Sequence, residues 1–509
     1  MPDLAGIRNR LRRTPPWARL ALVLVALYGA NLVANLVMVD AANHQEIITQ
    51  EELSATFKNP TFFVHRLQPI VTDTNGGDTL TYLVGSQVLG TGDLFYGRTW
   101  KALLMAGLAP LVYLVLRRRL GVDALPAFAA SGLLIVQPGL YAFGWLSTNY
   151  GLECVPGLLA VYLALSDRRS AVVWSGVALG YAAAIYGSGL AFVLPVGIAW
   201  LLRLYRSKER RRDLATCGGA GLLAVATLTW PIVWWTNSDR ILLGGAFGPP
   251  DRQENLRELV ASIVSGRESY YYYAHDRPVI VVAMLLLALV GIGLVLVRWP
   301  RWWVPASLGI GGAAIYINGG GILGIRRAVP VTLALVLFAG LGLGWAWNQR
   351  TQLRTVPVFR VAAMLVVGVA FLLGAVAYAH DRTALADGRL PLAQDAAFPN
   401  VPGQSMAATA DDLVAHASSE QIKALVGPGY VNTLPMIQMR RGDLFSDGGL
   451  WPLIYDTWRR DVAVCEGKAC APAPKREQVC YGVYANCVVP QQLPSSATTT
   501  TTSPPAGGP

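Results

Sequence analysis

The chain has 509 residues, of which 53% are hydrophobic and 14% are charged, and its formal net charge is +11. Soluble domains usually carry about 25% charged residues, so this composition excludes a water-facing globule of this length. The positive charge does not predict nucleic-acid binding, because Lys and Arg occur in short clusters between apolar runs, where they set membrane topology. We therefore expect an all-α polytopic membrane protein.

The apolar runs have about the length that a helix needs to cross roughly 30 Å of hydrocarbon. The first runs from Ala18 to Val39 after a basic arm. It is long and no small-residue cleavage site follows it, so we predict an uncleaved anchor rather than a signal peptide. With this run, the sequence predicts eleven transmembrane helices, the other ten at 99–116, 124–145, 150–166, 170–186, 188–205, 214–235, 278–297, 303–318, 327–347 and 360–380.

The basic clusters predict the orientation of these helices. If the N-terminus is cytoplasmic, every cluster falls in a cytoplasmic loop, as the positive-inside rule requires: Arg117–Arg119, Arg168–Arg169, 203–212, Arg298 with Arg301, and 350–360. The long segments 40–98, 236–277 and 381–509 then lie outside. We predict a multi-pass plasma-membrane protein with a cytoplasmic N-terminus and an extracytoplasmic C-terminus.

The chain divides into three regions by composition. Residues 1–380 form the predicted transmembrane domain, with outer loops at 40–98 and 236–277. The first outer loop contains an apolar stretch that is too short and too polar to span, which favours an amphipathic helix lying in the membrane interface. Residues 381–490 predict a small extracytoplasmic C-terminal domain, and the Thr/Pro-rich tail 491–509 is expected to be disordered.

Four cysteines lie close together in the C-terminal region: Cys465, Cys470, Cys480 and Cys487. An oxidising compartment outside the membrane would permit disulfides between them. A zinc site is the alternative, but the spacings lack paired Cys-x-x-Cys knuckles. We predict disulfides and leave their pairing open.

A family resemblance rests on the order of several segments. An acid, Asp40, closes the first span, a long outer loop follows, and then comes "YLVGSQVLGTGDLFYGRTWKALLMAGLAPLVYLVLRRRLG", in which Gly90 and Arg98 stand near a family Leu-Phe-Gly…Arg pattern. The later segments "SGVALGYAAAIYGSGLAFVLPVGIAWLL" and "GILGIRRAVPVTLALVLFAG" resemble the paired helices with a Gly-rich reversal and the late Arg-Tyr-x-x-Pro helix start. In this order the chain resembles the GT-C superfamily of integral-membrane glycosyltransferases, such as protein O-mannosyltransferases and bacterial aminoarabinose transferases.

The resemblance implies an enzyme of the GT-C type that depends on a polyprenyl-phosphate-linked sugar. It would be an inverting transferase that moves the sugar to a glycan, lipid or protein of the cell envelope at the outer face of the membrane. The implied catalytic base is Asp40, which would remove the acceptor proton. The implied phosphate ligands are Arg326 and Arg327, and Glu153 corresponds to a second acid of the family.

Each of these residues also has a structural interpretation. Asp40 could mark only the end of a helix, and Arg326 and Arg327 could be interfacial side chains that reach to lipid headgroups. Glu153 could be a paired acid at the end of a helix, but acids inside membrane spans are costly, and this favours a functional role. For phosphate, the two guanidiniums offer bidentate hydrogen bonds at a helix start.

Two further residues of the first outer loop, His65 and Glu46, are candidate substrate-binding groups. They could also hold a divalent metal together with Asp40 and His44, so a metal stays an alternative, although no cofactor is required. The expected partners are the sugar donor, the acceptor and membrane lipids, with no nucleic acid. A non-catalytic envelope-assembly scaffold or a transporter with the same architecture is the alternative function.

Overall fold

The structure is a computed structural model. It describes residues 15–37, 81–82, 84–85, 88–89, 94–146, 148–234, 251–265, 278–298, 303–318, 325–348, 356–386, 415, 479–481 and 486–488. The chain forms two compact units, Met1–Gln394 and Asp395–Pro509. The predicted catalytic residue Asp40 and the predicted substrate-binding residues Glu46 and His65 lie outside the described ranges, as do His44, Cys465, Cys470 and the tail from 491.

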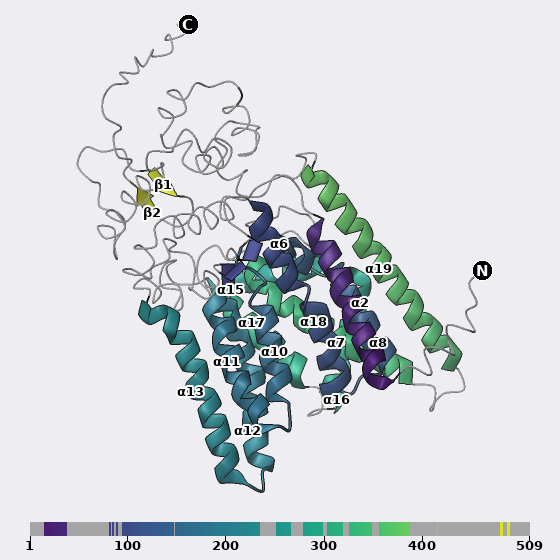
Figure 1. Ribbon diagram of the computed structural model, residues 1–509. Coiled ribbons are helices and arrows are strands. Elements are labelled where there is room, and N and C mark those ends of the chain that lie inside the picture. The colour runs from purple at the N-terminus through teal and green to yellow at the C-terminus, as the bar shows by residue number, and fades with distance from the viewer. Residues whose placement is uncertain are drawn as a thin grey trace, which may run out of the picture. The chain divides into compact units, whose positions relative to one another are not determined.

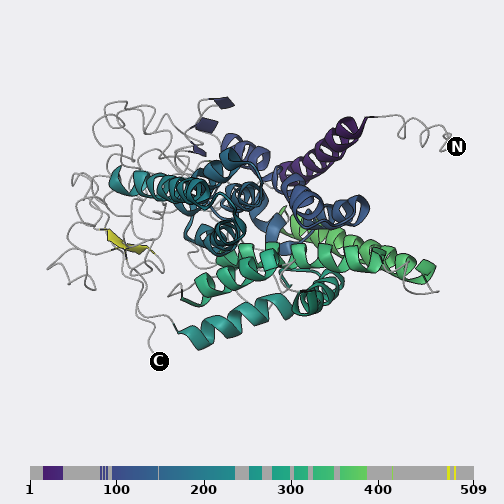
Figure 2. The ribbon, with the colours of Figure 1, turned by 90° about the horizontal axis from the view of Figure 1, so that it is seen from below.

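The first unit is all-helical where it is described, and its long helices run side by side (Figure 1). In the view from below, several of them are seen nearly end-on (Figure 2). The helices are, in chain order, α2 (Pro16–Leu36), α6 (Leu94–Met105), α7 (Leu108–Leu114), η1 (Val115–Arg119), α8 (Ala124–Leu134), α9 (Pro138–Gly144), α10 (Cys154–Ala164), α11 (Arg169–Ile185), η2 (Gly187–Phe192), α12 (Val193–Arg206), α13 (Arg210–Trp234), α15 (Arg252–Val264), α16 (Val282–Arg298), α17 (Trp303–Asn318), η4 (Ile325–Ala328), α18 (Val329–Asn348) and α19 (Val356–Ala386).

Several of these helices are long and apolar enough to cross a membrane, which confirms the predicted all-α membrane class. By length and composition, five qualify among the described residues: Pro16–Leu36, Phe95–Arg119, Gly187–Arg206, Val329–Asn348 and Arg360–Ala384. Four more apolar helices are shorter: Ala124–Leu134, Cys154–Ala164, Arg169–Ile185 and Val282–Val297. The count of eleven spans stays a prediction.

The run 124–145 was expected to be one span, but it forms two helices, α8 and α9. The break precedes Pro138, which lacks the N–H of a helix interior and disfavours helical backbone in the residue before it. The side chain of Gln137 holds the break in place, because its Nε2 donates to Leu133 O and its Oε1 accepts from Val281 N. The Gln137 side chain thus joins the end of α8 to the residue that precedes α16.

Glycines allow two helix pairs to pack with their backbones close together. A Cβ atom at Gly176 or Gly180 of α11 would overlap the carbonyl groups of Ala220 and Ala224 on α13. Gly291 of α16 lies in the same way against the backbone of Phe338 on α18. Small residues at i and i+4 bring helix backbones together in membranes, where hydrophobic exclusion from water does not drive association.

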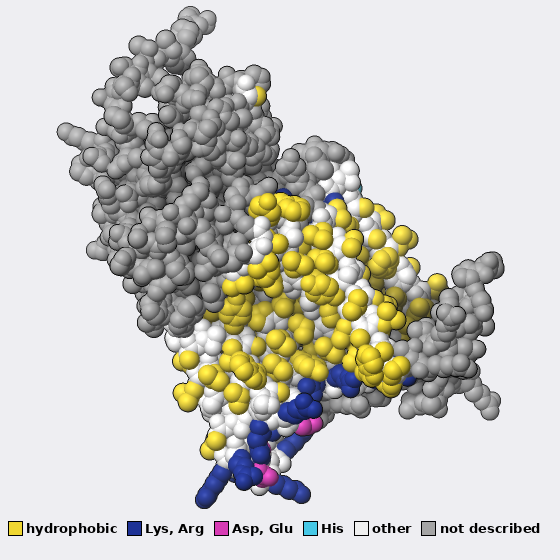
Figure 3. Space-filling view, viewed as in Figure 1, with side chains coloured by type: hydrophobic (Ala, Val, Ile, Leu, Met, Phe, Trp, Pro, Cys, Tyr) yellow, Lys and Arg dark blue, Asp and Glu magenta, His cyan; other side chains and the backbone are white. Residues whose placement is uncertain are grey.

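Charged side chains collect at one end of the first unit. Figure 3 shows Lys and Arg side chains gathered at its lower end, beneath a broad hydrophobic surface. One arginine from each of three predicted cytoplasmic clusters makes a hydrogen bond to a neighbouring segment there: Arg119 donates to Tyr162 O, Arg169 to Asp213 and Arg203 to Ser166 O. We call this the basic end.

In the second unit the structure describes two short strands, β1 (Val479–Tyr481) and β2 (Asn486–Val488). They pair antiparallel, and the register sets Cys480 opposite Cys487.

Candidate functional site

The described candidate residues lie at the end of the first unit that is opposite the basic end. α10 begins directly after Glu153 and ends at Ala164, next to the Tyr162 carbonyl that Arg119 binds. α11 begins at Arg169 in the basic end and runs away from it to Ile185, next to Tyr186. Glu153 and Tyr186 therefore lie at the same end of the helices, as the predicted topology requires.

Glu153 is fully buried at the start of α10, in a turn that includes Gly151 at a φ of +78°, a conformation that favours glycine. Its Oε1 accepts a hydrogen bond of 2.5 Å from Ser188 Oγ in η2. Its Oε2 has no hydrogen-bond partner within the described part of the chain. The carboxylate thus connects the start of α10 to the reversal between α11 and α12.

A buried cation accompanies this carboxylate. Lys101 of α6 is fully buried, and its Nζ donates to the carbonyl oxygens of Thr148 at 2.6 Å and Tyr150 at 2.7 Å. Its charge also acts favourably on Glu153. A buried ion is costly unless it is paired and hydrogen-bonded. The buried Lys101 is thus bound to carbonyl oxygens of the same turn, 148–153, that carries Glu153.

Arg327 contacts the same region from η4, at the start of α18. Its Nε donates to the phenol oxygen of Tyr186 at 3.2 Å, and its guanidinium carbon lies 5.9 Å from the centre of that ring. The Tyr186 ring in turn meets Tyr150 edge to face, with centroids 5.0 Å apart. Of the two predicted phosphate ligands, the structure describes the side chain of Arg327, whereas for Arg326 it describes only the backbone in η4.

A second group of buried charges surrounds Trp145. The guanidinium carbons of Arg98 (α6) and Arg382 (α19) lie 4.6 Å and 4.5 Å from the centre of the indole ring. Both arginines are 5% exposed, and Trp145 is fully buried. Such stacking is a favourable cation–π arrangement, and it is stronger when the cation is desolvated.

The neighbouring acid on α19 is also buried. Asp381 Oδ2 accepts a hydrogen bond of 2.6 Å from Tyr141 OH, and Asp381 Oδ1 lies 3.2 Å from His380 Nδ1. Tyr378, one turn earlier, donates to the carbonyl oxygen of Ala34 near the end of α2. The last turns of α19 thus lie beside the end of α2 and beside Trp145.

The end of α2 is held by two buried asparagines. Asn31 Nδ2 donates to Met105 O at 2.9 Å, and Asn35 Nδ2 donates to Asn31 Oδ1. The Asn35 carboxamide lies directly against Gly144, the residue before Trp145. The helix that precedes Asp40 therefore ends next to the Trp145 group.

Together these residues give one end of the unit an unusual set of buried charges. Three buried cations, Arg98, Lys101 and Arg382, and two buried carboxylates, Glu153 and Asp381, lie there with the half-buried Arg327. Aromatic side chains contact these charges or each other, among them Trp145, Tyr150 and Tyr186. Such an arrangement suits a ligand that carries negative charge beside an apolar or sugar-like part. Among the described side chains, no group of three His, Cys, Asp or Glu residues is placed to hold a metal ion.

Sequence patterns did not predict Lys101, Arg382 or Asp381 as site residues, and Arg98 was expected only from the resemblance. Lys101 could have been found as a charge within an apolar run that begins at 99. The pair Asp381–Arg382 follows a long apolar run, where charged residues usually mark the membrane surface, and this made it look unremarkable.

The chain was compared with protein-family models and with curated proteins. No family model matches, and no curated protein matches it significantly. The family resemblance therefore rests on the quoted segments alone.

Proposed function

We propose that the chain is an inverting glycosyltransferase of the GT-C type, which transfers a sugar from a polyprenyl-phosphate donor to an acceptor of the cell envelope. One observation carries the proposal. The resemblance was drawn from three segments, which contain Arg98, Tyr186 and Arg327. These residues lie at the same end of the unit as Glu153, in the contact groups around Trp145 and around Tyr186. These segments are far apart in the sequence.

The end of α2 supports Asp40 as the catalytic base. α2 ends beside Gly144 and Trp145, and its C-cap is Val37. Asp40 is three residues from Val37 in the sequence, a span of chain that reaches at most about 11 Å, and the proposal assigns it to this end of the unit. In the proposed step, the acceptor oxygen attacks the anomeric carbon while the bond to the phosphate oxygen breaks. The leaving phosphate keeps the bonding electron pair, and Asp40 takes the hydroxyl proton.

Arg326 and Arg327 would stabilise the leaving phosphate. Negative charge grows on the phosphate oxygens as the sugar leaves, and preorganised cations in a site without water stabilise such charge most. The hydrogen bond from Arg327 Nε to Tyr186 fixes the plane of the guanidinium, and the fork geometry of such a group suits a bidentate contact with phosphate. Glu153, which is fully buried, would act by positioning the reversal at Ser188.

The proposal includes an orientation. The basic end would face the cytoplasm, and the end with Glu153 and Trp145 would face outward, together with the C-terminal unit. The donor would reach its site from the outer leaflet of the plasma membrane. No step of the proposed reaction uses a metal ion.

The test uses the purified full-length protein in lipid nanodiscs. A panel of short-chain polyprenyl-phosphate hexoses and pentoses serves as donors, with released polyprenyl phosphate measured by mass spectrometry. Asp40→Asn keeps the size of the side chain but removes the basic oxygen. Activity should fall by about 10²-fold or more, because a positioned base contributes 10²–10⁴.

The matched control is Asp167→Asn, an exposed carboxylate at the basic end. It should retain wild-type turnover. Wild-type activity in the Asp40→Asn variant would remove Asp40 as the base. If the wild-type protein releases polyprenyl phosphate from none of the donors, the scaffold or transporter alternative replaces the proposal.

A further inference from the structure

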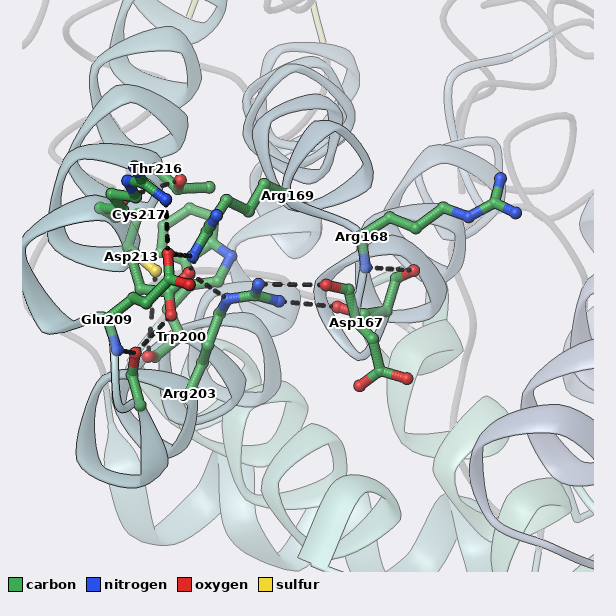
Figure 4. Close-up of polar contacts among 12 residues, drawn as sticks. Asp167, Arg168, Arg169, Trp200, Arg203, Glu209, Asp213, Thr216 and Cys217 are labelled. Atoms are coloured by element: carbon green, nitrogen blue, oxygen red, sulfur yellow. Dashed lines mark hydrogen bonds and ion pairs between the residues drawn. The ribbon is translucent and has the colours of Figure 1, made fainter.

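The turn between α12 and α13 is held by a network of ion pairs (Figure 4). Asp213 Oδ1 accepts from Arg169 Nε and Arg203 Nε, both at 3.1 Å, and Asp213 Oδ2 accepts from Ser207 Oγ. Glu209 accepts from Arg169 Nη2 at 2.7 Å and from Arg212 Nη1 at 3.0 Å. The network fixes this turn against the start of α11.

The buried acid of this network stays ionised. The hydrogen bond from Ser207 and those from Arg169 and Arg203 lower the pKa of Asp213 to about 2. The Arg203 guanidinium also donates to the carbonyl oxygens of Ser166 and Asp167. Both carboxylates of the turn are thus occupied by Arg169, Arg203 and Arg212.

Other cations of this region are left without a carboxylate. Within the described chain, none of five exposed side chains has an ion-pair partner: Arg168, Arg206, Lys208, Arg210 and Arg211. Figure 4 shows the Arg168 guanidinium pointing away from the network. The α12–α13 turn forms the basic tip in Figure 3. We call residues 206–211 the basic turn.

Apolar side chains adjoin the basic turn on both helices. Tyr205 is 87% exposed, and Leu201 on α12 and Leu214 on α13 are also exposed. α13 has 25 residues, which corresponds to about 37 Å at 1.5 Å per residue. The sequence predicts a span over 214–235, and a hydrocarbon core of about 30 Å would leave the charged first turn of α13 in the headgroup layer.

We propose that the basic turn binds the phosphodiester headgroups of anionic phospholipids in the leaflet at the basic end. The positive charge of the basic turn is complementary to the negative charge of these headgroups. The acids of the turn are already paired with arginines, whereas several other arginines have no carboxylate partner. The site is continuous with the apolar surface of Leu201, Tyr205 and Leu214, which places these arginines at headgroup depth. Basic clusters next to a membrane-spanning helix bind anionic lipids in this way. The inference does not depend on the proposed transferase activity.

The test counts lipids bound to the full-length protein. Protein in detergent micelles is titrated with dioleoylphosphatidylglycerol or dioleoylphosphatidylcholine, and bound lipid is measured by native mass spectrometry. The wild type should bind phosphatidylglycerol more tightly. Each cation at a membrane surface contributes about fivefold in affinity, so Arg210→Gln/Arg211→Gln should weaken phosphatidylglycerol binding on the order of 25-fold.

The matched control is Arg252→Gln/Arg257→Gln, which removes two exposed arginines from the start of α15. It should change the affinity less than about twofold, since these arginines lie far from the basic turn in sequence and on another helix. Equal loss in both variants, or equal binding of the two lipids by the wild type, would overturn the proposal.

Two further measurements separate the lipid from other anions. Added inorganic phosphate should displace phosphatidylglycerol no better than chloride at equal ionic strength, and stronger displacement would show a site for a free anion instead.

In the wild type, raising ammonium acetate from roughly 0.05 M to roughly 0.5 M should reduce the preference for phosphatidylglycerol, because the Debye length shortens. This measurement decides the proposal even if the double variant fails to fold, and an unchanged preference would contradict it.

Discussion

Arg327 donates a hydrogen bond from Nε to the phenol oxygen of Tyr186, although 141 residues separate the two in the sequence. Tyr186 lies between α11 and the reversal at η2, and Arg327 precedes α18. The phenol therefore holds the arginine through a neutral contact and does not add a second positive charge. This relationship makes the role of Arg327 measurable.

Tyr186→Phe removes the hydrogen-bond acceptor but keeps the ring. If Arg327 binds the donor phosphate, the KM for the donor should rise about two- to tenfold, because a hydrogen bond contributes about 0.5–1.5 kcal/mol. Arg327→Ala should cost about 1.5–3 kcal/mol, the contribution of a bond to a charged group. Steady-state kinetics with varied donor measures both effects. Tyr205→Phe, at the basic turn, is the control, and an equal rise there would contradict the assignment.

Glu153 and Lys101 are expected to stabilise the unit as a pair. Glu153→Gln leaves Lys101 buried next to a neutral group, which should lower the free energy of unfolding by about 3–5 kcal/mol. Ser188→Ala removes only the hydrogen bond to Oε1 and should cost about 1.5–3 kcal/mol. Unfolding in mild detergent with increasing denaturant, followed by circular dichroism, measures these values.

The double variant Glu153→Gln/Lys101→Met provides the control for this pair. It removes both charges, so its loss of stability should be smaller than the sum of the losses measured for Glu153→Gln alone and for Lys101→Met alone. Additive losses would mean that Lys101 and Glu153 are compensated by other groups.

The sequence predicted those parts of this architecture that depend on local composition. Apolar runs predicted the positions of the helices, and clusters such as Arg168–Arg169 predicted that basic side chains gather at one end of them. Glu153 was chosen because an acid next to an apolar run is costly. The contacts of Lys101, Asp381 and Arg382 could not be predicted, since periodicity describes one helix at a time and carries no information on which distant segment faces it. Tyr141 and Asp381, for example, are 240 residues apart.

The close packing of α11 on α13 predicts a large effect for a single methyl group. At Gly176 a Cβ atom would overlap the backbone carbonyl of Ala220, which cannot move away as a flexible side chain can. Gly176→Ala should therefore lower the free energy of unfolding by about 1–3 kcal/mol. In α12, by contrast, a Cβ atom at Gly197 would meet no atom within 4 Å.

Gly197→Ala is the matched control for this substitution. Alanine has the higher helix propensity, so this variant should be as stable as the wild type or more stable by about 1 kcal/mol. Thermal unfolding in detergent compares the two variants. A Gly176→Ala protein as stable as Gly197→Ala would mean that the two helices pack less closely.

The register of β1 and β2 predicts the pairing of the cysteines in the second unit. The backbone register sets Cys480 opposite Cys487 in the antiparallel pair. We therefore expect a disulfide between these two, which leaves Cys465 to pair with Cys470. Both pairs would form in an oxidising compartment outside the membrane.

Trypsin separates the alternatives, because the chain can be cut after Lys468 and Arg476 but has no Lys or Arg between Cys480 and Cys487. With the expected pairing, the non-reduced peptide 477–509 is not linked to any other peptide, and its mass is lower than that of its reduced form by two hydrogen atoms. The peptides that contain Cys465 and Cys470 are then joined to each other. Either of the other two pairings would join peptide 477–509 to both of them. Four free thiols in the freshly isolated protein would favour the zinc alternative, and removal of the metal by a chelator would then unfold this unit, because the folding of small zinc sites depends on the bound ion.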